Sequence, residues 1–217
     1  GDVYKRQQYV LNEKKPSPFT VPKIMPNAAA SHICIRNKIT GPSFTIATAC
    51  SSSTQAIGLG MSLIRSGVVD KAIVGGSEAM ISHGVMRTWE VMRALTPSSM
   101  KPFSKNRDGT VLGEGAGILV LESEKHNRDR NGPRLAKLIG FGTTTDGKDI
   151  VKPDVTGAAA AIEAALTDAQ ISHRQIDYIN AHGTGTLLND ANETAAIKKI
   201  FHEDAYDINI SSTKPIT

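Results

Sequence analysis

The stretch GPSFTIATAC, residues 41–50, runs directly into SSSTQAIGLGMSLIR, residues 51–65. The first part is rich in small and β-branched residues, so we interpret Phe44–Ala49 as a strand. The second part is helix-like and is expected to end near Gly67. Cys50 therefore falls at a strand-to-helix turn. There, unpaired backbone N–H groups and the helix dipole favour a negative charge.

Such surroundings can lower the pKa of a thiol from about 8.5 to ~3.5–7.5, and the thiolate is the nucleophilic form. The same N–H groups could hold a developing oxyanion. An isolated cysteine is otherwise a small packing residue, and this remains the alternative for Cys50. Cys34 lies in a helical pattern and is expected to serve packing only.

Two further strand ends carry polar side chains. The run Ile176–Ile179 leads into NAHGTGT at residues 180–186, and the chain closes with NISSTKPIT at residues 209–217. His182 and Lys214 thus also lie near strand ends, and the glycines after His182 allow a tight turn with room for a ligand. Finding a cysteine, a histidine and a lysine together at three strand ends is less common than finding any one of these residues at a strand end.

Strand-like and helix-like segments alternate along the chain, which predicts an α/β fold. Their apolar runs suggest strands that are covered on both faces. The expected strands, besides Phe44–Ala49, are Lys71–Val74, Gly115–Leu121, Leu135–Thr145, Ile176–Asn180 and Ile208–Ser211. The expected helices include Ala28–Arg36, Ser123–Arg130, Thr156–Ala169 and Asn189–Phe201.

The composition excludes several classes of protein. The 217 residues are 40% hydrophobic and 21% charged, which is ordinary for a globular chain. The net charge of +4 comes without the basic stripe and stacking aromatics of a nucleic-acid binder, although it suits an acidic carrier protein. Two cysteines make neither a disulfide framework nor a zinc motif, and no apolar run is long enough to span a membrane. We therefore expect a cytoplasmic protein without a metal site.

Five motifs together resemble the β-ketoacyl-acyl-carrier-protein synthases, or ketosynthases. They are TACSS at 48–52, GGSEA at 75–79, KPFSKNRDGTVLGEGAG at 101–117, AHGTGT at 181–186 and SSTK at 211–214. They occur in family order from about Pro22 to the end. The segment WEVMRAL at 89–95 is similar to the elongating bacterial fatty-acid type and leans toward its nodulation and specialised-metabolite branch.

The resemblance implies a thiolase-like layered αβαβα fold that is incomplete in this chain. Residues 8–145 would be the later part of the N-terminal half, and residues 146–217 the start of the C-terminal half. Residues 1–7 resemble a translated artefact rather than family sequence. The Gly-His pair expected after the lysine motif is absent, so we expect an internal fragment that neither folds nor works alone.

The resemblance also implies a decarboxylative condensation. Cys50 would carry the acyl group, His182 would hydrogen-bond the malonyl thioester oxygen, and Lys214 would tune the field around them. Thr184 and Thr186 would contact the phosphopantetheine arm of an acyl-carrier protein, and Glu193 would support the charge network. No tightly bound cofactor is expected, and relatives are commonly homodimers. The alternatives without a catalytic role are a surface lysine for Lys214, turn hydroxyls for Thr184 and Thr186, and a charge in the first turn of a helix for Glu193.

Other classes of protein stay open. A catalytically silent ketosynthase-like partner would shape a heterodimer, but such proteins lack the cysteine. A thiolase is disfavoured by AHGTGT, and a cysteine hydrolase by the lack of a residue that would orient a base histidine. A ketosynthase domain of a modular polyketide synthase shares the sequence Ala49–Ser53.

Overall fold

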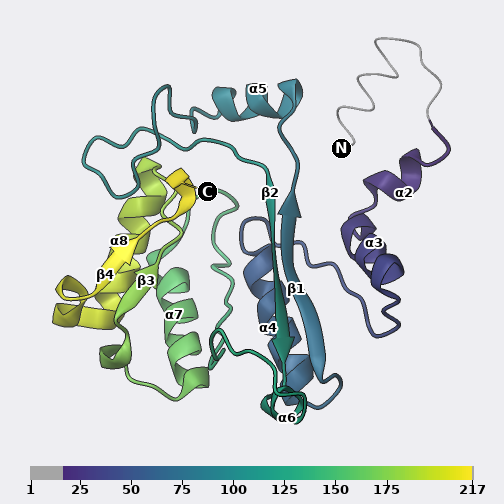
Figure 1. The fold of residues 1–217 in the computed structure, drawn as a ribbon. Helices are drawn as coiled ribbons and strands as arrows, with labels where there is room; N and C mark the ends of the chain where they lie inside the picture. Colours follow the sequence, from purple (N-terminus) through teal and green to yellow (C-terminus); the bar gives the residue numbers. More distant parts are fainter. Residues whose placement is uncertain (1–16, 217) are drawn as a thin grey trace. The chain divides into compact units, whose positions relative to one another are not determined.

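The computed structural model describes residues 17–216, so the predicted leader at residues 1–7 lies outside the described residues. The chain forms two compact units (Figure 1). The first takes the chain up to Met86 together with Gly113–Ala136, and the second takes Arg87–Leu112 and Lys137–Thr217. The division into halves at residue 145, expected from the family, remains a prediction.

The first unit is built on one helix and one pair of strands. Strand β1 (Lys71–Glu78) pairs antiparallel with β2 (Gly115–Glu122), from Lys71 opposite Glu122 to Glu78 opposite Gly115. Helix α4 (Ser52–Arg65) packs on β1, and Met61 and Val74 are buried there. The helix after Cys50 and both strands are therefore confirmed.

Two short helices precede this core and one follows it. Helices α2 (Thr20–Ile24) and α3 (Ala28–Asn37) are consecutive, and Cys34 lies on α3, partly exposed. Helix α6 (Glu124–Asp129) begins after Ser123, whose hydroxyl accepts the His126 N–H as an N-cap. Helix α5 (His83–Val91) contains the boundary between the two units.

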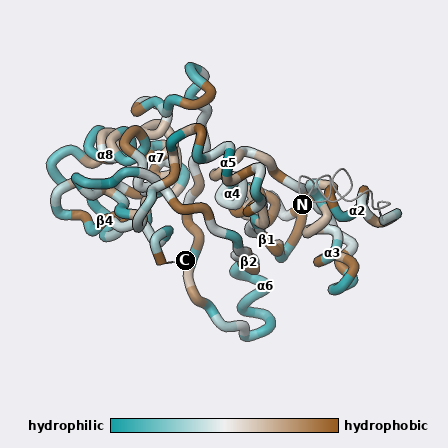
Figure 2. Tube along the Cα trace, turned by 90° about the horizontal axis from the view of Figure 1, so that it is seen from above, coloured by the Kyte–Doolittle hydropathy of each residue, from teal (hydrophilic) through white to brown (hydrophobic). Residues whose placement is uncertain are grey.

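The basic residues around α6 form ion pairs, and Figure 2 colours this turn as hydrophilic. The Arg130 guanidinium donates to both Glu122 oxygens at 2.7 Å, in the bidentate geometry that arginine favours. This pairing, with a hydrogen bond from Asn127, lowers the pKa of Glu122 to about 2. Arg128 pairs with Glu124.

The second unit packs two helices beside a parallel pair of strands. Strand β3 (Tyr178–Asn180) pairs with β4 (Asn209–Ser211), and α7 (Val155–Ala169) packs against α8 (Leu187–Phe201). The buried side chains include Ala159, Ala196, Ile197 and Phe201. Asp154 caps α7 by accepting the N–H groups of Thr156 and Gly157. Short 3₁₀ turns, His173–Gln175, His202–Tyr206 and Lys214–Ile216, join or follow these elements.

Two strand predictions are wrong for the described residues. Phe44–Ala49 forms no ladder, and only an isolated bridge joins Thr48 to Cys50. Leu135–Thr145 likewise forms no ladder. Its middle part packs against α7, where a Cβ at Gly142 would meet the helix backbone at Ala165 and Phe141 N–H donates to Asp168. Both segments have strand-like composition, but a strand exists only where another segment completes its hydrogen bonds.

The expectation that the strands are covered on both faces is also wrong here. Ile118, Leu119 and Val120 of β2 are 49–67% exposed. The apolar run correctly predicted a strand. Burial of both faces depends on other segments that pack on the strand, and among the described residues these faces stay partly exposed. Within residues 17–216, no helix has the length and apolar character needed to cross a membrane.

The contact between α4 and β1 depends on a glycine and gives a first prediction. A Cβ at Gly60 would lie 2.5 Å from Val74 Cγ1, so an added methyl group would overpack this contact. Gly60→Ala should lower the free energy of unfolding by about 1 kcal/mol, because overpacking at ~1–3 kcal/mol exceeds the ~1 kcal/mol gained in helix propensity.

Denaturant unfolding of the gene product that contains this chain measures this effect. In a Val74→Ala background the clashing methyl is gone, so Gly60→Ala should there be neutral or stabilising. Equal destabilisation in both backgrounds would contradict the packing described.

Candidate active site

The turn that carries His182 follows β3 directly. Ala181 N–H donates to Ser211 O of β4 at 2.8 Å, which extends the strand pairing by one residue. The chain then turns through Gly183 (φ 42°) and Gly185 (φ 74°), in the left-handed region that favours glycine. A Cβ at Gly183 would lie 2.5 Å from that of Ser212, so the close approach of the two chains also requires glycine.

Helix α8 holds this turn through the Glu193 carboxylate. Glu193 Oε1 accepts His182 N–H at 2.6 Å, and Oε2 accepts Gly183 N–H at 2.8 Å. These N–H groups lie beyond the strand ladder and would otherwise lack a protein acceptor. Glu193 is therefore more than a charge near a helix end: it fixes the backbone on which His182 is placed.

Lys214 lies on the other side of the same turn. Its Nζ donates to His182 O at 2.5 Å, and Ser212 Oγ donates to Gly183 O at 2.9 Å. The structure therefore brings His182, Lys214 and Glu193 together, although they lie on three separate segments. All three belong to the second unit.

The surroundings of the His182 imidazole lower its pKa. Partial burial of the ring is the largest cause, because desolvation disfavours the charged form, and the Lys214 ammonium acts in the same direction. The carboxylates of Glu193 and Asp190 oppose the shift without cancelling it. His182 as a residue still reaches solvent. The neutral imidazole, which carries one ring N–H, is thus favoured.

The two threonines of the turn contact each other. Thr184 Oγ1 and Thr186 Oγ1 are 2.9 Å apart, and both residues are partly buried. Thr186 precedes α8 as its N-cap residue without a side-chain capping bond. The hydroxyls are thus placed beside the His182 turn. Their predicted contact with a pantetheine arm remains a prediction.

A second carboxylate, Asp190, was not singled out from the sequence. It is 1% exposed, and its oxygens accept Gly185 N–H at 3.2 Å and Phe103 N–H at 2.7 Å. Arg107 Nε lies 3.7 Å away and also donates to Thr186 O. Asp190 and Glu193 are three residues apart on a predicted helix, a spacing that places them on one face and could have revealed the pair.

The loop at residues 96–112 is thereby attached to the His182 turn. Besides the bonds of Phe103 and Arg107, Gly109 N–H donates to Gly185 O at 3.1 Å. Two acidic residues of the motif at residues 101–117 accept hydrogen bonds within loops. Asp108 accepts the Thr96 hydroxyl at 2.6 Å, and Glu114 accepts Ile81 N–H at 2.7 Å.

Cys50 lies in the first unit, on the turn that precedes α4, and is exposed. Ala49 before it has φ 52°, a left-handed conformation that costs a non-glycine residue about 1–2 kcal/mol. The serines that follow hold this turn. Ser52 Oγ accepts Thr48 N–H at 2.8 Å and donates to Ala49 O at 2.7 Å, and Ser51 Oγ donates to Thr48 O. The turn presents Cys50 outward at the start of a 14-residue helix.

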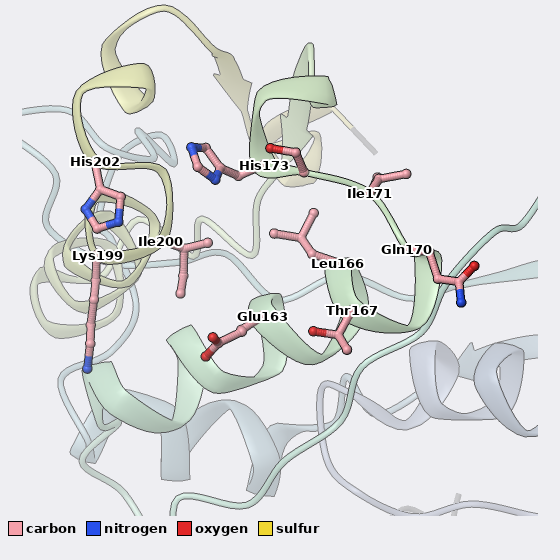
Figure 3. Close-up of a pocket in the computed structure, with 10 residues that line it drawn as sticks. Glu163, Leu166, Thr167, Gln170, Ile171, His173, Lys199, Ile200 and His202 are labelled. Carbon is pink, nitrogen blue, oxygen red and sulfur yellow. The ribbon is translucent and has the colours of Figure 1, made fainter.

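Figure 3 shows a cavity in the second unit. Its volume is about 510 Å³, and its lining comes from the second half of α7, the connection after it and the end of α8. None of the predicted site residues lines it. No cluster of potential metal ligands occurs within residues 17–216.

The burial of Asp190 gives a second prediction. In Asp190→Asn an amide NH₂ must face one of the two N–H donors, and an unsatisfied buried donor costs about 1–3 kcal/mol. We expect the free energy of unfolding to fall by about 2 kcal/mol. The exposed Asp207→Asn serves as the control, with a change below about 0.5 kcal/mol. Equal effects of the two substitutions would show that Asp190 does not hold the turn.

The electrostatics of His182 give a third prediction. Lys214→Met removes a positive charge that disfavours the imidazolium, so the pKa of His182 should rise. Glu193→Gln removes a negative charge that favours it, so the pKa should fall further. Titration by NMR of histidine-labelled protein measures both. Lys199→Met is the control. A shift of the His182 pKa in the same direction in both variants would contradict the arrangement.

Comparisons with known proteins show which family the chain is similar to. The beta-ketoacyl synthase N-terminal domain model matches residues 2–127, and the C-terminal domain model matches residues 135–217. Nodulation protein E of Rhizobium leguminosarum bv. trifolii is 45% identical over 196 residues, covering 90% of this chain and 49% of that protein. The 3-oxoacyl-[acyl-carrier-protein] synthase 2 of Staphylococcus aureus is 38% identical over 223 residues, covering 100% of this chain and 55% of that protein.

A similar solved structure is a type II polyketide ketosynthase in complex with its acyl-carrier protein. It has a TM-score of 0.94 and 31% identity, covering 100% of this chain and 57% of that chain. The likeness confirms the predicted thiolase-like α/β fold. The chain spans about half the length of the curated relatives it matches. On the family match and the shared fold, this chain belongs to the beta-ketoacyl synthase family.

Proposed function

We propose that the gene product containing this chain is a β-ketoacyl-acyl-carrier-protein synthase. It joins a cysteine-bound acyl group to malonyl-acyl-carrier protein by decarboxylative Claisen condensation, giving 3-ketoacyl-acyl-carrier protein. The observation that carries this proposal is Cys50, exposed on a fixed turn at the start of α4 in a chain of this family. The similarity to a 3-oxoacyl-[acyl-carrier-protein] synthase supports the same reaction.

In the first step the Cys50 thiolate attacks the acyl thioester on the carrier protein. A bond forms between Cys50 Sγ and the acyl carbon, and the carrier thiol leaves as the thiolate and takes up a proton. Covalent capture divides one difficult step into two and holds the acyl group while the carriers exchange.

In the second step the malonyl thioester loses carbon dioxide. The electron pair of the broken carbon–carbon bond moves into a thioester enolate, whose carbon attacks the acyl group on Cys50 and expels the Cys50 thiolate. His182 donates a hydrogen bond to the enolate oxygen and so stabilises charge that develops in the transition state. The lowered pKa of His182 favours the neutral ring, which keeps a donor available without a full charge.

The other predicted residues support these two steps. Lys214 and Glu193 hold the His182 backbone, and Lys214 also keeps the pKa of the imidazole low. Thr184 and Thr186 would contact the phosphopantetheine arm, which delivers both substrates without any tightly bound cofactor. Their position within the same turn as His182 supports this assignment.

The remaining expectations belong to the same proposal. The partner is an acyl-carrier protein, as in the similar ketosynthase complex, and the gene product acts in the cytoplasm as a homodimer. Residues 8–145 belong to the N-terminal half of the thiolase-like fold and residues 146–217 to the C-terminal half. The two family matches, which meet between residues 127 and 135, support a division in this region.

Acylation provides the test of this proposal. The gene product is incubated with an acyl-carrier thioester, and the adduct is located by peptide mass. We expect the acyl group on Cys50, its release as a 3-ketoacyl product when malonyl-carrier protein is added, and loss of both in Cys50→Ala. Cys34→Ala should retain both, because Cys34 lies on α3, outside the motif that carries Cys50. A folded wild-type protein without an adduct at Cys50 would instead favour a silent partner subunit.

A further inference from the structure

Asn189 lies in the first turn of α8, beside the two carboxylates that hold the His182 turn. The residue is partly buried, and its Nδ2 lies 3.1 Å from Asp190 Oδ1 and 3.4 Å from Glu193 Oε2. A single amide nitrogen, with two hydrogens, thus reaches both carboxylates. The reverse orientation of the amide would point its oxygen at two negative groups, so the donor assignment follows from charge.

The oxygens that Asn189 reaches are the ones that hold glycines of the turn. Asp190 Oδ1 also accepts Gly185 N–H, and Glu193 Oε2 also accepts Gly183 N–H. We propose that Asn189 is a positioning residue, whose amide bridges these two carboxylates and thereby fixes the backbone around His182. Its importance for catalysis rests on the proposed function, while the bridge itself does not.

The bridge is needed because the carboxylates repel each other. Asp190 and Glu193 lie three residues apart on one helix, a spacing at which like charges destabilise. The charged groups that face them are Arg107 near Asp190, and His182 and Lys214 at the turn near Glu193. Asn189 adds a donor between the two without adding a charge. It thereby offsets part of the repulsion between two carboxylates that each accept N–H bonds from the turn.

This role predicts a characteristic response to pH. Asn189→Asp keeps the shape of the side chain but replaces the donor by a third carboxylate. As the pH falls, a proton bound among the three carboxyl groups can replace the missing amide hydrogen. Asn189→Ala leaves a gap in which no group can donate. The loss of thermal stability and of condensation rate in Asn189→Asp should therefore shrink at low pH. The same losses in Asn189→Ala should not shrink.

Two measurements on the gene product that contains this chain test the proposal. The first is the midpoint of thermal unfolding between pH 8 and pH 5, relative to wild type at each pH. The second is kcat for condensation, which should fall on the order of tenfold to a hundredfold in Asn189→Asp at pH 8 and recover toward pH 6. KM for the carrier thioester and the acylation of Cys50 should be unchanged.

Ala195→Asp is the matched control, because it adds the same charge to an exposed position of α8. It should leave both readouts close to wild type. The bridging role is overturned if the unfolding midpoint and kcat of Asn189→Asp equal those of Ala195→Asp at every pH. It is also overturned if they equal those of Asn189→Ala at every pH. If wild type does not condense, the proposed function fails, and the unfolding midpoints still decide whether Asn189 forms the bridge.

Discussion

The backbone of residues 182–185 leaves its strand in a conformation that cannot continue a ladder, and the second unit is arranged around this constraint. Two glycines with positive φ angles make the turn, and its N–H groups need acceptors from elsewhere. Helix α8 supplies them from two carboxylates one turn apart, Asp190 and Glu193. Asp190 also reaches the loop at residues 96–112, where it accepts Phe103 N–H and pairs with the Arg107 side chain. The position of one imidazole thus depends on three segments.

The same arrangement sets the charge of that imidazole. Acceptors strong enough to hold the turn are anionic, and by themselves they would favour the imidazolium. Burial of the ring and the Lys214 ammonium outweigh them, so the pKa of His182 falls. Lys214 therefore has two effects, because its bond to His182 O also holds the backbone. A neutral donor held rigidly is what stabilisation of an enolate oxygen requires.

Local patterns predicted the helices and paired strands well, since capping residues and apolar periodicity are properties of neighbouring residues. The predicted helices Ala28–Arg36 and Thr156–Ala169 are found as α3 and α7 within one residue at each end, and α4 begins just after Cys50. Phe44–Ala49 and Leu135–Thr145 were predicted wrongly because pairing is a property of two segments and composition describes only one. Asp190 was missed for a related reason: its partners Phe103 and Arg107 lie more than 80 residues earlier. The family motifs indicated His182 and Lys214, but only the structure showed that Lys214 contacts the His182 backbone.

We propose that the His182 turn serves the decarboxylation step and that Cys50 holds the acyl group. A single-turnover experiment tests it most directly. Cys50 is first loaded with an acyl group, malonyl-carrier protein is added, and carbon dioxide and 3-ketoacyl product are followed together in wild type and in His182→Ala. The account predicts that both appear in equal amounts in wild type, and that both are lost in His182→Ala while the acyl group stays on Cys50. Undiminished release of carbon dioxide in His182→Ala would contradict it.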